Sequence, residues 1–220
     1  YVNLVRVVFM RYVKYPRTPL LPWSPHKDDD DIRIVDCSAF AGEEVVITEK
    51  MDGENTTMYR DRCHARSIDS GHHPSRSWVK GLHSQIAHLI PEGWRLCGEN
   101  LYARHSIAYD NLPSYFLLFN IWDDQNVCLS WDETEEWAKL LGLHTVPVLY
   151  RGPWDESLVR DLFDPYVKQD RTEGIVVRVA RSFTFEEFGR VVAKVVREGH
   201  VQTDEHWMHK EVVPNKLLRR

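Results

Sequence analysis

The chain has 220 residues, of which 43% are hydrophobic and 28% are charged, values that are ordinary for a folded globular protein. Acidic residues outnumber basic ones by 33 to 28, which excludes a uniformly basic surface, so any site for a polyanion must be local. No apolar run approaches the roughly 18 residues needed to span a bilayer, so no membrane partner is expected. The cysteines form no C-x-x-C pair, which argues against a zinc knuckle and favours a cytoplasmic protein with free thiols at Cys37, Cys63, Cys97 and Cys128.

The first 40 residues are rich in proline and contain an acidic run at 28–31. This composition predicts an arm or loop over about residues 1–40, with one short strand at its start and the acidic run in solvent. The composition changes after this arm, because residues 45–48 are β-branched and mostly apolar. The turn signal Asp52-Gly53 separates them from residues 56–59. We predict a hairpin with Lys50 beside its bend.

Apolar residues at spacings of three and four predict a helix from a cap at Ser77 to about Ile90. Strands are predicted over 95–99 and 115–122. Ser130 and Glu133 match a capping box for a helix over 131–141, which Gly142 ends. A helix near 157–168 and strands over 174–179 and 190–196 follow.

Strands and helices therefore interleave without the strict alternation of a doubly wound fold. We expect an α+β domain built on antiparallel sheets, in which residues 1–220 form one unit. A short tail would begin at about residue 198. Within that tail, residues 200–209 combine histidine and acidic side chains, and we interpret them as a clasp in which Trp207 packs against the domain rather than as a metal cluster.

A lysine motif, Glu49-Lys50-Met51-Asp52-Gly53, follows the apolar strand over 45–48. Taken alone, K-x-D-G is short enough to occur by chance. Polar groups recur, however, at four later points in apolar strands, where only a site or a chain reversal requires them. The four segments, in chain order, are Cys97-Gly98-Glu99-Asn100, Phe119-Asn120-Ile121-Trp122, Thr172-Glu173-Gly174-Ile175 and Val192-Ala193-Lys194-Val195.

This ordered series resembles the signature motifs of the covalent nucleotidyltransferases, the superfamily of DNA ligases, RNA ligases and messenger-RNA capping enzymes. The resemblance extends from Lys50 to Lys194. Ahead of it, Lys14-Tyr15-Pro16-Arg17 is similar to the N-terminal segment of phage and bacterial nick-sealing RNA ligases. The resemblance implies an ATP-grasp-like adenylation domain of antiparallel sheets flanked by helices, without a separate OB domain.

The activity that the resemblance implies is that of an ATP-dependent RNA ligase. Such an enzyme forms a lysyl-AMP intermediate, transfers AMP to the 5′-phosphate of an RNA end and joins this end to a 3′-hydroxyl. Its cofactors would be ATP and Mg²⁺ or Mn²⁺. Its partners would be RNA ends, held in a nicked or aligned duplex, and a separate protein that helps to grip the substrate.

The resemblance also assigns roles to individual residues. Lys50 would form the bond to AMP, with Glu49 beside it in the nucleotide-binding set. Asp52 would be more important for the steps that use the adenylate than for the step that forms it. Glu99 would hold the ribose hydroxyls, and Phe119 would stack on the adenine, although an aromatic side chain in an apolar strand is also a common core residue.

The remaining roles concern charge. Glu173 would place the metal, with Glu99 as the second carboxylate ligand. Lys194 would contact the α-phosphate, and a lysine among valines needs such a partner. Arg66 would lie near the sugar or the acceptor 5′-phosphate, unless it is only a surface ion-pair partner.

An amine attacks phosphorus only when it is deprotonated, so Lys50 is expected to have a lowered pKa, through burial or through the positive charge of Lys194 and a metal. Two positions depart from the family pattern. Val192 stands where a second lysine is common, so Arg178 or Arg197 would have to help with the phosphate. Asn120 stands where an aspartate is common, which argues against a carboxylate role there.

Two alternatives remain open from the sequence. A guanylyltransferase that caps RNA uses the same lysyl-nucleotide chemistry with GTP in place of ATP. A catalytically silent module that binds RNA ends would retain the pocket without the reaction. The presence of Lys50, Glu99, Glu173 and Lys194 together argues against the silent module.

Overall fold

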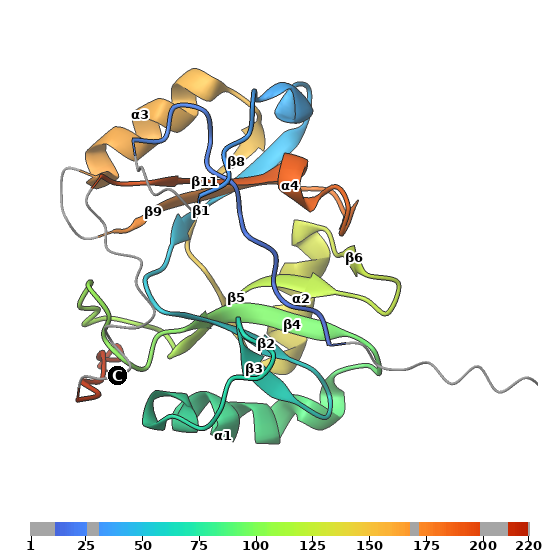
Figure 1. Cartoon of the computed structure of the whole chain (residues 1–220), viewed down its shortest axis with the longest axis vertical. Coiled ribbons are helices and arrows are strands. Elements are labelled where there is room, and N and C mark those ends of the chain that lie inside the picture. Colours follow the sequence, from blue (N-terminus) through green and yellow to red (C-terminus); the bar gives the residue numbers. More distant parts are fainter. Residues whose placement is uncertain (1–11, 26–30, 168–171, 199–210, 220) are drawn as a thin grey trace, which may run out of the picture.

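The computed structural model describes residues 12–25, 31–167, 172–198 and 211–219, and in it two β-sheets lie one above the other (Figure 1). The upper sheet has the strand order β11-β9-β1-β8, and the lower sheet has the order β10-β6-β5-β4-β2-β3 with β7 beside β5. Among the described strands, only β5 and β7 pair in parallel. The predicted α+β class with antiparallel sheets is therefore confirmed.

The strands of the upper sheet are β1 (Glu44–Lys50), β8 (Val148–Pro153), β9 (Gly174–Val179) and β11 (Val192–Val196). Those of the lower sheet are β2 (Glu54–Met58), β3 (Cys63–Ala65), β4 (Arg95–Asn100), β5 (Phe116–Trp122), β6 (Val127–Cys128), β7 (His144–Thr145) and β10 (Phe183–Thr184). The helices are η1 (Ser38–Phe40), η2 (Pro74–Arg76), α1 (Ser77–Ile86), η3 (Ala87–Leu89), α2 (Trp131–Leu141), α3 (Glu156–Val167) and α4 (Phe188–Val191).

Three hydrophobic clusters make up the core, and two of them contain residues of both sheets. Helix α3 covers the upper sheet, where Val159 and Phe163 pack against the valines of β9 and β11. Helices α1 and α2 pack against the lower sheet, where Val79 and Ala138 contact the apolar residues of β4 and β5. Helices thus cover the outer faces of both sheets, and the faces that point toward each other remain for a site.

The predicted hairpin around Asp52-Gly53 is wrong. Strand β1 pairs with β8 and β9, whereas β2 pairs with β3 and β4, so residues 51–53 carry the chain from one sheet to the other. A turn signal specifies a change of direction, but it does not specify which strands pair on either side. Gly53 fits the crossing because a Cβ atom there would lie 2.5 Å from the Asn100 carbonyl oxygen. Lys50 consequently lies where the chain leaves the upper sheet.

The predicted cap at Ser77 is also wrong. Ser77 is the first residue of α1 and makes no capping hydrogen bond. The side-chain cap belongs instead to the preceding turn η2, where the His73 side chain accepts a hydrogen bond from the Ser75 N–H. The helix ends at Ile86, and Leu89 lies in η3 with 47% of its surface exposed. The apolar face predicted as far as Ile90 therefore has a break at Leu89.

Other boundaries follow the sequence closely. Helix α2 has the predicted bounds, the capping box and the left-handed Gly142 with φ 66°. Strand β11 begins at Val192, two residues later than predicted, because the residues before it form α4. Strand β8 was not predicted, since its residues are only partly buried and have no hydrophobic periodicity.

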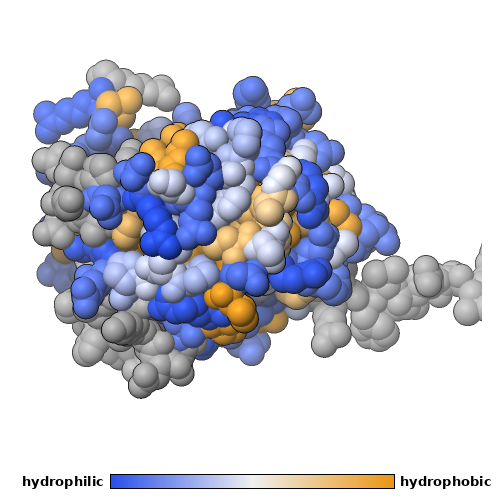
Figure 2. Space-filling model, turned by 90° about the horizontal axis from the view of Figure 1, so that it is seen from above, coloured by the Kyte–Doolittle hydropathy of each residue, from blue (hydrophilic) through white to orange (hydrophobic). Residues whose placement is uncertain are grey.

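The described part of the N-terminal arm runs across the edge of both sheets without a strand of its own, apart from single bridges from Leu20 to Arg33 and to Lys194. The strand predicted at the start of the chain and the Trp207 clasp lie outside the described residues. In the described part of the chain, no helix is long and apolar enough to cross a membrane. Seen from above, hydrophilic residues surround several small hydrophobic areas (Figure 2).

Candidate active site

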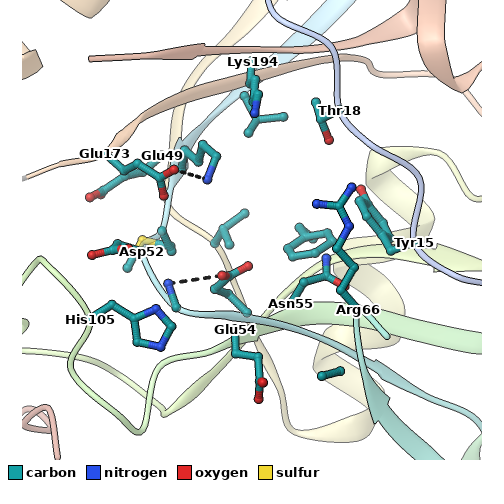
Figure 3. A pocket seen from close by; sticks show the side chains of 18 of the residues that line it. Tyr15, Thr18, Glu49, Asp52, Glu54, Asn55, Arg66, His105, Glu173 and Lys194 are labelled. Atoms are coloured by element: carbon teal, nitrogen blue, oxygen red, sulfur yellow. Dashed lines mark hydrogen bonds and ion pairs between the residues drawn. The ribbon is translucent and has the colours of Figure 1, made fainter. Parts of the chain in front are cut away.

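A cavity of about 950 Å³ lies between the two sheets, lined from above by β1, β9 and β11 and from below by β2, β4 and β5 (Figure 3). The structure brings together all the side chains that the sequence singled out, although they come from separate strands. Those that line the cavity are Glu49, Lys50, Asp52, Arg66, Glu99, Phe119, Glu173 and Lys194.

Strand pairing places Lys50 beside Glu173. Lys50 pairs with Gly174 across β1 and β9, and the Lys50 Nζ atom donates to Glu173 Oε1 at 2.5 Å. The side chain of Glu173 is 3% exposed and that of Lys50 is 24% exposed, so the ion pair lies on the wall of the cavity. Gly174 allows this arrangement, because a Cβ atom there would lie 1.9 Å from the Val195 carbonyl oxygen.

The expected lowering of the Lys50 pKa is wrong for the protein by itself. Burial opposes the charge of Lys50, but the carboxylates of Glu173 and Glu99 outweigh burial and raise the Lys50 pKa above its ordinary value. Lys50 is therefore a protonated ammonium at neutral pH. It must lose a proton before it can act as a nucleophile.

Glu99 lies on β4, across the cavity from the upper sheet, and its Oε1 accepts from the Gly53 N–H at 3.2 Å. Burial raises the pKa of Glu99 to about 8, although the charge of Lys50 opposes the rise. Asn55, which the sequence reasoning missed, pairs with Glu99 across β2 and β4 and also lines the cavity. Its buried Oδ1 has no hydrogen-bond partner among the described residues. The only signal for it was its place two residues after the lysine motif.

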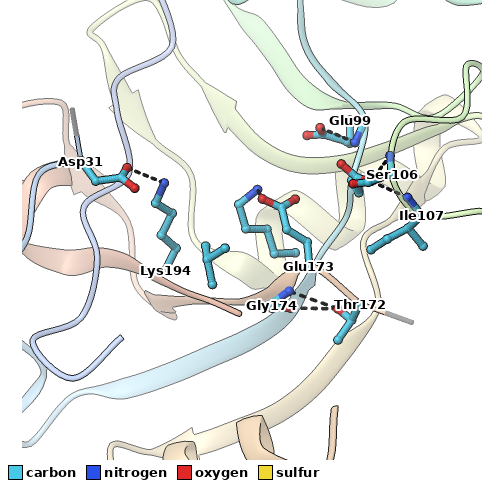
Figure 4. Close-up of polar contacts among 12 residues, drawn as sticks. Asp31, Glu99, Ser106, Ile107, Thr172, Glu173, Gly174 and Lys194 are labelled. Atoms are coloured by element: carbon cyan, nitrogen blue, oxygen red, sulfur yellow. Dashed lines mark hydrogen bonds and ion pairs between the residues drawn. The ribbon is translucent and has the colours of Figure 1, made fainter. Parts of the chain in front are cut away.

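Lys194 extends from β11 into the cavity, and its Nζ donates to Asp31 Oδ1 at 2.9 Å (Figure 4). Burial lowers the pKa of Lys194, while the hydrogen bond to Asp31 opposes the change. Asp31 was predicted to lie in solvent with the rest of the acidic run. That expectation is wrong for Asp31, which is only 16% exposed, and residues 28–30 lie outside the described part of the chain.

Phe119 lies on β5, next to Tyr15 of the N-terminal arm. Their rings meet edge to face with centroids 5.3 Å apart, and the Tyr15 hydroxyl accepts from Asn120 Nδ2 at 2.7 Å. Tyr15, Pro16 and Thr18 line the cavity. The segment that resembled the start of nick-sealing ligases therefore lies along the same site.

Arg178 connects the two sheets. From β9 its guanidinium donates to Asn120 Oδ1 at 2.7 Å and to the Leu129 carbonyl at 2.8 Å, both in the lower half of the protein. Arg178 also lines the cavity, so its expected help with the phosphate stays a prediction. Arg197 lies next to Glu173, because the Arg197 backbone N–H donates to the Glu173 carbonyl. Arg66 follows β3 on the opposite wall of the cavity.

Asp52 is 6% exposed and is held by the loop between β4 and β5. Its Oδ2 accepts from the Ser106 N–H at 2.9 Å, from the Ser106 hydroxyl at 2.8 Å and from the Ile107 N–H at 2.7 Å. Its own N–H donates to the Tyr109 hydroxyl at 2.9 Å. No signal in the sequence pointed to these loop residues, because they follow no periodic pattern.

The described residues contain no group of three or more acidic, histidine or cysteine side chains that would hold a metal by themselves. Magnesium usually binds one or two carboxylates and completes its coordination with water and substrate phosphates. Glu173 and Glu99 supply two carboxylates that face one cavity. The residues present therefore fit a divalent ion that binds together with a nucleotide.

Three comparisons relate this chain to known proteins. The family model for RNA ligase matches residues 43–196. An archaeal ATP-dependent RNA ligase is similar with a TM-score of 0.58 and 16% identity over 83% of this chain and 48% of that chain. An RNA ligase of Naegleria gruberi, solved with PPi, is similar with a TM-score of 0.50 and 19% identity over 71% of this chain and 50% of that chain. No curated protein matches.

At these identities the solved structures show a shared fold. The chain spans about half the length of the structures that it matches. The region matched by the family model contains all the strands that line the cavity, from β1 to β11. Because this model covers well over half of the sequence, the chain belongs to the RNA ligase family.

Proposed function

We propose that this protein is an ATP-dependent RNA ligase with Lys50 as its nucleophile. The observation that carries the proposal is the Lys50–Glu173 ion pair on the wall of a cavity large enough for a nucleotide. Glu99, Phe119 and Lys194 line the same cavity from three other strands. The family match supports the same activity.

In the proposed reaction, the Lys50 Nζ attacks the α-phosphorus of ATP, so that a phosphorus–nitrogen bond forms and pyrophosphate leaves. AMP then passes to the 5′-phosphate of an RNA end, which frees the Lys50 amine. Attack by a 3′-hydroxyl on the activated phosphate joins the two ends and releases AMP. Lys194 lies on the upper wall, where its ammonium group would contact the α-phosphate after it separates from Asp31.

The other lining residues divide between the nucleotide and the RNA. Phe119 would stack on the adenine, and Glu99 would accept hydrogen bonds from the ribose hydroxyls. Glu49 lies on β1 next to the nucleophile and belongs to the nucleotide-binding set. Arg66, on the opposite wall, would contact the sugar or the acceptor 5′-phosphate.

The ammonium of Lys50 must lose its proton, and the two carboxylates that raise its pKa are also the candidate metal ligands. A divalent ion supplies positive charge that neutralises carboxylate and phosphate oxygens. Glu173 and Glu99 would hold such an ion, and its positive charge would compete with Lys50 for the Glu173 carboxylate.

The substrate that we propose is a pair of RNA ends aligned in a nicked duplex, with a separate protein that contributes to the grip. The net charge of −5 supports this proposal, since a net-acidic protein holds a polyanion only through local contacts. We also propose the cytoplasm as its compartment. All four cysteines are free thiols, which fits a reducing environment.

The decisive experiment is incubation with α-labelled ATP and Mg²⁺ or Mn²⁺, followed by denaturing electrophoresis. We expect label that stays on the protein, that disappears when the metal is chelated, and that falls about 100-fold or more in Glu173→Gln. α-Labelled GTP is the matched control. Transfer from GTP alone would favour the capping reaction, and no label from either nucleotide would favour the silent RNA-end binding module.

A further inference from the structure

We propose that residues 211–219, here called the C-terminal strap, position the Asp52 turn of the active site and that Asn215 is the positioning residue in this strap. The inference rests on the proposed function, because it concerns the same site. The strap lies beside the loop of residues 101–115 between β4 and β5, here called the β4–β5 loop (Figure 1). It is far from the lysine motif in sequence but borders the same cavity through Glu211, Val212 and Val213.

The β4–β5 loop contains no helix or strand in the described structure, and the strap supplies much of its backbone bonding. The Arg104 N–H donates to the Val213 carbonyl at 2.8 Å, and the Lys216 N–H donates to the Tyr109 carbonyl at 2.9 Å. The Leu112 N–H donates to the Lys216 carbonyl at 3.1 Å. Loop and strap thus form one hydrogen-bonded unit.

Asn215 is the centre of this unit and is 3% exposed. Its Nδ2 donates to the Leu101 carbonyl at 2.8 Å and to the Ala103 carbonyl at 3.4 Å, while its Oδ1 accepts from the Tyr109 N–H at 2.9 Å. Both ends of the amide are therefore used by the loop backbone. Only a side chain with a donor and an acceptor at these places satisfies the three buried groups.

Tyr109 links Asn215 to the active site. Its backbone N–H is bound by Asn215, and its hydroxyl accepts from the Asp52 N–H at 2.9 Å. The adjacent Ser106 and Ile107 hold the Asp52 carboxylate through three hydrogen bonds (Figure 4). The contacts run from the strap through the loop to a residue two positions after the proposed nucleophile.

A loop held by few contacts opens locally at low cost, and each lost buried hydrogen bond makes opening easier. Removal of the Asn215 amide should therefore loosen Ser106 and Ile107 and with them the Asp52 carboxylate. The cavity itself should persist, because its walls are strands of both sheets. The strap thus sets the geometry of the Asp52 turn and leaves the nucleotide-binding walls in place.

Hydrogen exchange of the full chain tests this directly and does not depend on activity. In Asn215→Ala we expect the Ser106 and Ile107 amides to exchange about tenfold faster or more, while the amides of β1 and β9 stay protected. Lys216→Ala is the matched control, since the exposed Lys216 contributes its backbone and not its side chain to the contact. Unchanged exchange at Ser106 and Ile107 in Asn215→Ala would overturn the proposal.

Tyr109→Phe is the second variant, and it decides the question if Asn215→Ala does not fold. It keeps the backbone bond to Asn215 and removes only the hydroxyl that binds the Asp52 N–H. We expect faster exchange at Asp52 with full protection at Lys216 and Leu218 in the strap. Protection at Asp52 equal to wild type would contradict the link.

A double-mutant cycle connects the strap to catalysis. If Asn215 acts through Asp52, Asn215→Ala should slow the sealing of pre-adenylated RNA about tenfold in the wild-type protein and have little further effect in Asp52→Ala. Equal slowing in both backgrounds would show that Asn215 acts only on the fold. Absence of covalent labelling in wild type would reject the proposed function, and the exchange experiment would still decide the role of the strap.

Discussion

At the scale of single residues, the pair of Lys50 and Glu173 combines two requirements that conflict. Lys50 must be held in place, which a buried carboxylate does, and it must also become a free amine, which the same carboxylate opposes. In the proposed function, a divalent ion would replace Lys50 as the cation beside Glu173. The Lys50–Glu173 ion pair would therefore be present before the reaction and would be broken during it.

Lys50→Arg separates charge from nucleophilicity. Arginine keeps a positive partner for the buried Glu173, but its guanidinium does not lose a proton in proteins and cannot attack phosphorus. We expect no covalent AMP labelling and a melting temperature close to that of wild type. The control is Lys139→Arg on the exposed side of α2, which should label as wild type does. Labelled Lys50→Arg protein would reject Lys50 as the nucleophile.

His64 makes the fold sensitive to acid. It is 3% exposed on β3, its Nδ1 lies 2.5 Å from the Ala65 carbonyl oxygen, and burial lowers its pKa below the ordinary value. The unfolded chain therefore takes up a proton near pH 6.5 that the folded chain resists, so the free energy of unfolding should fall as the pH is lowered from 7 to 5.

In His64→Gln this part of the pH dependence should be absent. Relative to wild type, the free energy of unfolding of His64→Gln should therefore be higher at pH 5 than at pH 7. Urea unfolding at pH 5 and pH 7 measures this free energy. His88→Gln in the exposed turn η3 is the control. An identical pH dependence in wild type and His64→Gln would contradict the assignment.

At the scale of secondary-structure elements, the crossing from β1 to β2 and the pairing of β9 with β11 bring the site together. β1 ends at Lys50, β9 begins at Gly174 just after Glu173, and β11 carries Lys194 opposite Val176. Lys50 and Glu173 thus lie at strand ends, whereas Lys194 lies in the middle of β11. Small errors in strand spacing would move these side chains relative to one another.

Gly174→Ala tests this dependence on strand spacing. A Cβ atom at this position would lie 1.9 Å from the backbone oxygen of Val195, which the rigid strand cannot avoid, so we expect a loss of about 3 kcal/mol in the free energy of unfolding. Gly81→Ala in α1 is the matched control, because a Cβ there meets nothing within 4 Å and alanine favours a helix. The control should gain about 0.5–1 kcal/mol. Equal stability of the two variants would contradict the close approach of β9 and β11.

At the scale of the whole molecule, the two sheets form two walls of one cavity and share parts of the hydrophobic core. The walls are joined by the crossing at residues 51–53, by the arm that carries Tyr15, and by Arg178, which binds Asn120 and Leu129 from the upper sheet. Apolar residues of both sheets also belong to the same hydrophobic clusters, which helps to hold the two walls together. In the proposed function, this cavity would admit a nucleotide and then an RNA end.

The proposed RNA specificity leads to a prediction about the substrate. Sealing should be faster on a nick whose 3′-hydroxyl strand ends in ribose than on one that ends in deoxyribose, because the 2′-hydroxyl offers a hydrogen bond and favours A-form geometry. Sealing should also be strongest at low ionic strength, since the few phosphate contacts of a net-acidic chain weaken with salt.

The measurement compares matched nicked duplexes in which only the last one or two sugars of the 3′-hydroxyl strand change. The same change in the 5′-phosphate strand is the control. Equal rates with ribose and deoxyribose at the 3′-hydroxyl end would leave a polynucleotide ligase without RNA specificity.

The sequence by itself determined those features that depend on local patterns. The capping box and Gly142 predicted α2, and runs of apolar residues predicted β4, β5 and β9. The motif series and the family resemblance also singled out eight of the side chains that line the cavity. These features were readable because strand ends, caps and polar residues in apolar strands are set by neighbours in the chain.

Only the tertiary structure decided how these pieces meet. It separated β1 from β2 into different sheets, bound Asp31 to Lys194, and raised the pKa of Lys50 through carboxylates from β4 and the start of β9. It also placed Asn215 behind the Asp52 turn. Strand pairing and charge contacts between distant segments depend on packing of the whole chain, and no local pattern specifies them.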